Sequence, residues 1–250
     1  MPRFAANLSF LFTERPFPER FSAAAKAGFE AVEFLFPYAY PASDVRDWLE
    51  EAGLKLALFN TPVHDWEDGG RGVAALAGEE ARFRAEFDLA LSYADVLAPH
   101  HIHVMAGLAQ GEDAAEVYER NLTWAAQHAP AQSLTIEPIN ADDMPGYFLA
   151  DFDQAVQVID RVSTANLGLQ FDAYHAHRIT GEVMGSWARC ARHARHVQVA
   201  GVPGRHEPMG GQIDYPAFFR QLDAGGYTGF VGAEYHPAAG TTAGLGWRDF

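Results

Sequence analysis

Short apolar runs alternate with longer amphipathic segments along the whole chain. The apolar runs predict strands, at residues 3–10, 31–36, 54–60, 101–105, 134–137, 167–171, 196–199 and 229–234. The segments between them predict helices, at residues 19–28, 44–52, 79–94, 113–127, 151–162, 182–193 and 215–224. This alternation, at about 30-residue spacing, is typical of right-handed βαβ units around a parallel sheet.

Turn and cap residues support this assignment. Gly28 ends one predicted helix and Gly53 follows the next, and both act as stop signals. Ser43 is predicted to cap the helix over 44–52. The connection over 61–78, which carries Trp66 and Arg71, is long for a compact domain. Loops of this length are more often functional than accidental.

Eight strands, each followed by a helix, predict an α/β (β/α)8 TIM barrel that forms a single domain over residues 1–250. Only residues 244–250 remain for the eighth helix, so it is expected to be shortened. The alternative is a doubly wound open sheet. We disfavour it because the first strand-to-helix turn lacks a glycine-rich phosphate-binding sequence.

Four polar residues end four consecutive predicted strands, about one strand–helix unit apart: Glu137, Asp172, Gln198 and Glu234. In a barrel, the carboxyl ends of the strands converge on one mouth. A single acid after a strand is usually a helix cap or a solvated loop residue, but four in register indicate a shared site. Three crowded carboxylates would repel one another. We therefore predict that they bind a divalent metal, Mg²⁺ or Mn²⁺.

Other polar side chains are expected near the same mouth. His175 follows Asp172 by three residues and is the strongest candidate, because that turn directs it back over the mouth. His103 lies in the fourth predicted strand, and Arg205 lies after the seventh, where barrels often hold anionic groups. A single histidine at such a position is more often a core or loop residue than a catalytic one, and Arg205 is equally compatible with a solvated loop position.

The sequence argues against two classes of enzyme. A Schiff-base aldolase needs a lysine at a strand end, but the chain has only Lys26, in a predicted helix, and Lys55, at the start of a strand. A serine hydrolase is unsupported because no Gly-x-Ser-x-Gly motif is present. Two glutamates beside a metal suit proton transfer at the carbon next to a carbonyl.

Composition and charge bear on partners and location. The formal charge of −15 disfavours nucleic acid as a partner. The amino terminus does not resemble a signal peptide, and no apolar run reaches the roughly 20 residues that a membrane helix needs. The single cysteine, Cys190, cannot form an intramolecular disulfide, which fits a reducing compartment. We therefore expect a cytoplasmic protein that binds neither nucleic acid nor membranes.

Several long motifs occur in a fixed order, at residues 7–9 (NLS), 71–72 (RG), 103–107 (HVMAG), 135–140 (TIEPIN), 143–148 (DMPGYF), 171–175 (FDAYH), 196–200 (HVQVA), 203–208 (PGRHEP), 234–235 (EY) and 244–247 (GLGW). With Asn60, they resemble the hydroxypyruvate isomerase family of xylose-isomerase-like TIM barrels over the full chain. One departure is Ala141-Asp142, which stands where relatives tend to carry basic residues.

The resemblance implies an aldose–ketose type isomerisation of a small hydroxy-oxo acid, namely hydroxypyruvate to 2-hydroxy-3-oxopropanoate (tartronate semialdehyde). It implies that Glu137 and Glu234 are the proton donor and acceptor and that these two, with Asp172 and Gln198, hold the metal. It also implies substrate contacts by four residues, Asn60, His103, His175 and Arg205. A homo-oligomer is compatible with this family.

Four alternatives remain open at this point. The nearest is the same reaction on a longer acid, which would interconvert 2-dehydrotetronate and 3-dehydrotetronate. A ketose epimerase shares the barrel. A metal-dependent phosphodiesterase acting on abasic DNA also shares it, but the acidic charge and Gln198 argue against that function. The last alternative is a barrel that binds a small acid without turning it over.

Overall fold

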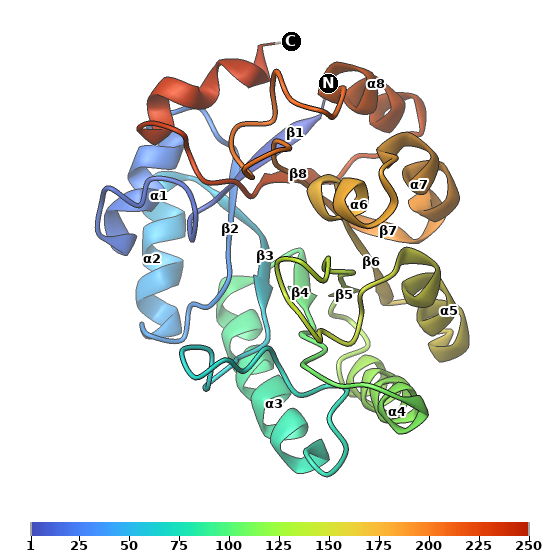
Figure 1. The fold of residues 1–250 in the computed structure, drawn as a ribbon. Coiled ribbons are helices and arrows are strands. Elements are labelled where there is room, and N and C mark those ends of the chain that lie inside the picture. Colours follow the sequence, from blue (N-terminus) through green and yellow to red (C-terminus); the bar gives the residue numbers. More distant parts are fainter. Residues whose placement is uncertain (1, 250) are drawn as a thin grey trace.

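Eight parallel strands close into a barrel in the computed structural model, which describes residues 2–249 (Figure 1). The strands pair in sequence order and β1 pairs with β8. They are β1 (Arg3–Asn7), β2 (Ala31–Phe34), β3 (Lys55–Asn60), β4 (His101–His103), β5 (Leu134–Ile136), β6 (Leu167–Asp172), β7 (Ala194–Val199) and β8 (Phe230–Ala233). The predicted TIM barrel is confirmed.

Helices lie outside this ring of strands (Figure 1). They are α1 (Phe17–Lys26), α2 (Ala42–Ala52), α3 (Glu80–Leu97), α4 (Glu112–His128), α5 (Phe152–Val162), α6 (Ala173–Thr180), α7 (Val183–Cys190) and α8 (Tyr215–Ala224), with the 3₁₀ helices η1 (Ala191–His193) and η2 (Thr241–Arg248). In α5, the buried residues Phe152, Ala155, Val158, Ile159 and Val162 recur every three or four positions. That spacing forms one apolar face for packing against the barrel. None of the described helices is both long and apolar enough to cross a membrane.

The connection from β6 to β7 contains a helix that was not predicted from the sequence. The pattern indicated one helix over 182–193 and a turn after Asp172, whereas α6 begins immediately after that residue. Asp172 is the N-cap of α6, because its Oδ1 accepts backbone hydrogen bonds from Tyr174 (2.7 Å) and His175 (3.2 Å). The acid that ends the strand therefore also starts a helix.

Two further predictions about local structure have different outcomes: the predicted cap of α2 is wrong, and the shortened last helix is confirmed. Ser43 does not cap α2, which begins at Ala42, two residues earlier than predicted, with Pro41 at the N-cap position. The hydroxyl of Ser43 donates instead to Asp44 Oδ1. The shortened last helix is the 3₁₀ helix η2, and position 250, which the prediction included, lies outside the described residues. Trp247 of η2 is buried and donates to the hydroxyl of Tyr235 at 3.1 Å.

The barrel interior changes from apolar to polar along the strands. Alternate residues of a strand share a face, so Ala5 lies below Asn7, and Ala31 below Glu33; the two pairs are in register. Asn7 and Glu33 are buried. Gly232 of β8 leaves room for this layer, because an added Cβ there would lie 2.4 Å from Glu33 Oε1. The polar layer continues upward into the mouth of the barrel.

The burial of His101 should make the folded protein less stable in acid. Burial, followed by the neighbouring His196, lowers the pKa of His101 to about 3. In the unfolded chain the pKa of histidine is about 6.5. Below that pH, His101 binds a proton in the unfolded state but stays neutral in the folded state. Stability is therefore lost as the pH falls from about 6.5 towards 3.

Between pH 7 and pH 5 the unfolding free energy of wild type should fall. We expect this fall to be smaller in His101→Asn, by on the order of 1–2 kcal/mol. Urea denaturation of wild type and variant at the two pH values measures this difference. The exposed His64 provides the control, His64→Asn. An equal pH dependence in wild type and His101→Asn would contradict the expectation.

Candidate active site

A cavity of about 210 Å³ opens at the carboxyl ends of the strands. Six of the predicted site residues line it: Asn60, His103, Glu137, His175, Arg205 and Glu234. The other two, Asp172 and Gln198, are fully buried next to it. The structure therefore brings all eight to one place. Apolar side chains, including Phe10, Leu35 and Trp66, complete the wall.

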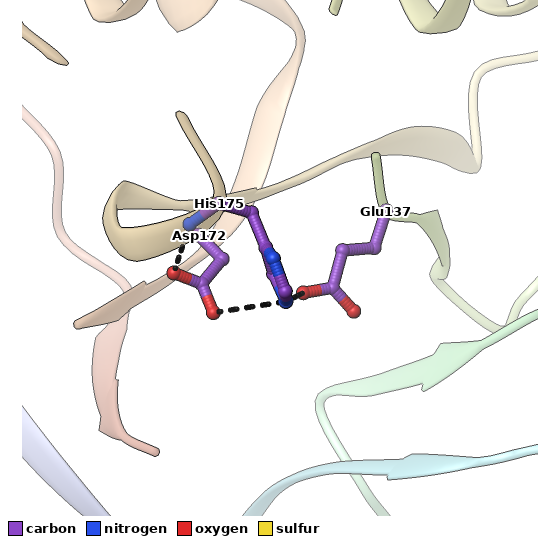
Figure 2. Close-up of side chains that lie close together, drawn as sticks. All are labelled: Glu137, Asp172 and His175. Atoms are coloured by element: carbon purple, nitrogen blue, oxygen red, sulfur yellow. Dashed lines mark hydrogen bonds and ion pairs between the residues drawn. The ribbon is translucent and has the colours of Figure 1, made fainter. Parts of the chain in front are cut away.

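Glu137, Asp172 and His175 lie close together in this site (Figure 2). Glu137 follows β5, where Pro138 ends the strand, Asp172 ends β6, and His175 lies in the first turn of α6. His175 Nε2 is 3.9 Å from Glu137 Oε1 and 3.9 Å from Asp172 Oδ2. Figure 2 shows the imidazole between the two carboxylates. One ligand atom from each residue lies within 4.8 Å of the others, so this cluster can hold a metal ion.

Two oxygens of the cluster fit a metal especially well. Glu137 Oε1 and Asp172 Oδ2 are buried and accept no hydrogen bond from any described residue. A buried, unpartnered carboxylate oxygen is costly. Hard divalent cations prefer oxygen ligands of this kind. A cation between these two oxygens would offset the free-energy cost of burying them without hydrogen-bond donors.

His175 is better suited to donate a hydrogen bond than to ligate. Its Nδ1 faces the side-chain amide nitrogen of Asn140 at 2.7 Å and the backbone N–H of the same residue at 3.4 Å. The Asn140 amide is fixed in that orientation, because its Oδ1 accepts from the N–H groups of Asp142 and Asp143. Nδ1 is thus the acceptor, and we assign the proton to Nε2. Burial, then Arg205, lowers the pKa of His175 well below its usual value, so the ring is neutral.

Arg205 neutralises the acids of the site. Its Nη2 donates to Glu234 Oε1 and lies 3.7 Å from Asp172 Oδ2, and its Nη1 lies 4.0 Å from Asp143 Oδ2. The guanidinium is also 5.0 Å from the ring centroid of Tyr174, within cation–π range. Both terminal nitrogens of Arg205 therefore face carboxylates of the protein itself, whereas its Nε is buried without a hydrogen-bond partner among the described residues.

Amide side chains hold the remaining carboxylate oxygens. Glu234 Oε2 accepts from Asn7 (2.9 Å) and Gln198 (2.7 Å). Gln170 donates to Glu137 Oε2 (2.9 Å) and to Gln198 Oε1 (2.7 Å). The oxygen of Gln198, predicted as a metal ligand, is thus engaged by Gln170, while its nitrogen lies between two glutamates.

Three residues of this network were not predicted from the sequence: Asn7, Glu33 and Gln170. Glu33 accepts from Asn7 (3.1 Å), Gln198 (2.7 Å) and His196 (2.6 Å). The sequence did contain a signal, because Glu33 and Gln170 are lone polar residues inside apolar strands. Such residues need buried partners, and the partners lie on other strands.

Burial and mutual repulsion alter the acidity of the carboxyl groups. Burial, then Glu234 and Asp172, raises the pKa of Glu137 well above its usual value. Burial raises the pKa of Glu234 to about 8, although Arg205 opposes the shift. The pKa of Asp172 is raised mainly by burial. A glutamate whose pKa is about 8, as for Glu234, can take up and release a proton near neutral pH, which suits general acid–base catalysis.

Two further polar side chains of the cavity can receive a ligand. His103 is buried, neither of its ring nitrogens has a hydrogen-bond partner among the described residues, and Nδ1 is 3.6 Å from Glu137 Oε2. Burial lowers the pKa of His103 to about 3, so it is neutral. Asn60 Oδ1 is likewise buried and without a partner in the described part of the chain. Asp142, the departure noted in the sequence, forms an ion pair with Arg178 of α6, which offsets its charge.

A closed parallel barrel with acids at the carboxyl ends of its strands defines an enzyme scaffold of the TIM-barrel class. The chain belongs to the xylose isomerase-like TIM barrel family, whose family model matches residues 21–249.

The relatives agree with this assignment. A Cupriavidus necator protein named 2-oxo-tetronate isomerase is 50% identical, over 99% of this chain and 97% of that protein. An Escherichia coli protein named hydroxypyruvate isomerase is 39% identical, over 100% of this chain and 99% of that protein. A Brucella melitensis crystal structure named AP endonuclease, family 2, is 42% identical with a TM-score of 0.97, and covers 100% of this chain and 98% of that one.

We expect Asp172→Asn to weaken Mn²⁺ binding by about tenfold or more, because it replaces an unpartnered carboxylate oxygen with an N–H donor. Asparagine keeps the side-chain oxygen that caps α6, so folding should be retained. Mn²⁺ titration monitored by electron paramagnetic resonance measures the affinity.

The matched control is Asp95→Asn, on the exposed face of α3. It removes the same charge away from the cavity and should bind Mn²⁺ like wild type. Equal affinity in Asp172→Asn and wild type would mean that Asp172 is not a ligand.

Proposed function

We propose that the protein is an aldose–ketose type isomerase of small acids that carry a 2-oxo group and a 3-hydroxyl group. One observation carries this proposal: Glu137 and Glu234 line one small cavity, and both have a raised pKa. Two such glutamates suit the transfer of a proton between adjacent carbons. The cavity, about 210 Å³, is smaller than the roughly 300–1,000 Å³ typical of sites for drug-sized ligands.

Two substrates share the required groups. The family resemblance implies hydroxypyruvate, which would give 2-hydroxy-3-oxopropanoate, and the Escherichia coli relative is named hydroxypyruvate isomerase. The second candidate is 2-oxo-tetronate, favoured by the name of the relative at 50% identity. In both acids the reaction moves the carbonyl group from C2 to C3. The two differ only in the extra hydroxymethyl group of the four-carbon acid.

The proposed proton transfers balance within the substrate. One glutamate, as carboxylate, removes the proton from C3 and gives an enediolate. The other glutamate, as neutral acid, delivers a proton to C2, and the hydroxyl proton passes from the C3 oxygen to the C2 oxygen. The reverse reaction exchanges the two roles. His175, neutral with its proton on Nε2, donates a hydrogen bond to a substrate oxygen.

The proposed cofactor is a divalent metal, Mg²⁺ or Mn²⁺. Glu137 and Asp172 would hold it through their unpartnered oxygens, with Gln198 and Glu234 completing the set that the sequence predicts. The bound ion would supply positive charge where the substrate oxygens become negative. Arg205 keeps Glu234 and Asp172 compatible with each other when both are ionised.

A nuclease function is disfavoured, although the Brucella melitensis structure carries the name of an endonuclease. The chain has 33 acidic and 18 basic residues, so its net charge repels a phosphate backbone at long range. Within the cavity, Arg205 is already paired with carboxyl groups of the protein. That environment suits a small substrate held next to a metal.

We expect Glu137→Gln and Glu234→Gln each to slow the exchange of the substrate C3 proton with solvent deuterium by about 10²–10⁴-fold, because glutamine cannot accept a proton. Proton NMR of hydroxypyruvate and of 2-oxo-tetronate in deuterium oxide measures the exchange. The same spectra identify the products, so they also rank the two substrates.

Glu51→Gln, on the exposed surface of α2, removes one glutamate charge away from the cavity and should exchange at the wild-type rate. Undiminished exchange in both cavity variants would refute the glutamate pair.

A further inference from the structure

The two arginines that line the cavity have different partners. Arg205 contacts three carboxyl groups of the protein, on Asp143, Asp172 and Glu234. A substrate carboxylate that approached it would compete with these charges. Arg205, which the sequence predicts to contact the substrate, is therefore a poor anchor for an anionic group. The second arginine, Arg71, lines the same cavity from the long loop between β3 and α3.

Arg71 has only neutral partners among the described residues. Its Nη1 donates to the backbone carbonyls of Trp66 (3.1 Å) and Gly70 (2.6 Å), and its guanidinium carbon lies 4.2 Å from the centroid of the Trp66 ring. Of the nearby acids in the same loop, Asp65 pairs with Arg82 at 2.8 Å, and neither Glu67 nor Asp68 forms an ion pair with Arg71 among the described residues. The charge of Arg71 is thus uncompensated. Its Nε and Nη2 donate to no residue in the described part of the chain and remain available.

The loop backbone holds Arg71 in place. Gly72 has a φ of +98°, and an added Cβ would lie 2.5 Å from the carbonyl oxygen of Met105, so only glycine fits there. Gly72 bridges to Ala106, beyond β4, and Ala75 donates its N–H to the Ala106 carbonyl at 2.8 Å. Trp66, on which Arg71 stacks, packs against Phe36 with ring centroids 5.2 Å apart. The guanidinium is therefore preorganised on a fixed loop rather than on a free one.

We propose that Arg71 binds the carboxylate of the substrate through its free guanidinium edge and so makes the enzyme specific for acids over neutral hydroxy-ketones. This inference rests on the proposed function, because it assigns the group that recognises the acid. A guanidinium and a carboxylate match in two parallel hydrogen bonds. The two arginines then have separate roles: Arg205 neutralises carboxylates of the protein, and Arg71 binds the carboxylate of the substrate.

The test compares an acid with its amide. We expect Arg71→Gln to raise the KM for hydroxypyruvate by about 10–100-fold, as charge-assisted hydrogen bonds are lost, and to change kcat by less than about threefold. The KM for the neutral amide, hydroxypyruvamide, should change by less than about threefold. Arg71→Lys keeps the charge without the paired geometry and should lie between wild type and Arg71→Gln.

A matched control is Arg84→Gln. Arg84 also stacks on a tryptophan, 5.1 Å from the ring of Trp124, but it does not line the cavity. This variant should behave like wild type. An unchanged KM for hydroxypyruvate in Arg71→Gln would overturn the inference. An equal rise for the acid and the amide would also overturn it, because loss of loop structure would then explain the effect.

Binding of D-glycerate, which lacks the oxo group and cannot isomerise, separates the inference from the proposed function. Calorimetric titration with Mn²⁺ present gives its Kd for wild type and Arg71→Gln. If Arg71→Gln binds D-glycerate more weakly than wild type, by about tenfold or more, the inference is supported. This holds even if wild type isomerises neither acid, and in that case only the proposed function fails. Turnover by wild type with equal D-glycerate affinity in both proteins overturns the inference alone. If wild type neither isomerises an acid nor binds D-glycerate, both the inference and the proposed function are overturned.

Discussion

The crowding of carboxyl groups inside a closed barrel is the constraint on which the site depends. Glu33, Glu137, Asp172 and Glu234 are all buried, and among the described residues one arginine, Arg205, contacts two of them. The pKa values of Glu137, Asp172 and Glu234 rise mainly because burial penalises their charge. Amide donors satisfy some of their oxygens, and the oxygens left over are those that fit a metal.

The amide side chains have a second role, because they connect the acids to one another. Gln198 donates to both Glu33 and Glu234, and Asn7 of β1 does the same. Each amide therefore fixes two carboxylates at once. A barrel supports this arrangement well, since its strands hold the donors rigidly while the loops above carry the groups that meet the substrate.

Much of the barrel and part of the site could be predicted from the sequence. Glu137, Asp172, Gln198 and Glu234 lie together because parallel strands end at the same edge, a consequence of their spacing alone. The helix α6 was missed because its cap, Asp172, was interpreted only as a site residue. Glu33 and Gln170 were missed because a lone polar residue in an apolar strand has no visible partner in the sequence.

The sequence by itself determined the order of the strands and which side chains stand at their carboxyl ends, because periodicity and spacing are local properties. Only the tertiary structure decided which partner each polar atom takes. Asn7 donates to Glu234 across 227 positions of sequence. Asn140 sets the proton of His175 on Nε2, and Arg205 is bound by acids whereas Arg71 is not. Hydrogen bonds act over about 3 Å, so these choices depend on distances that closure of the barrel alone establishes.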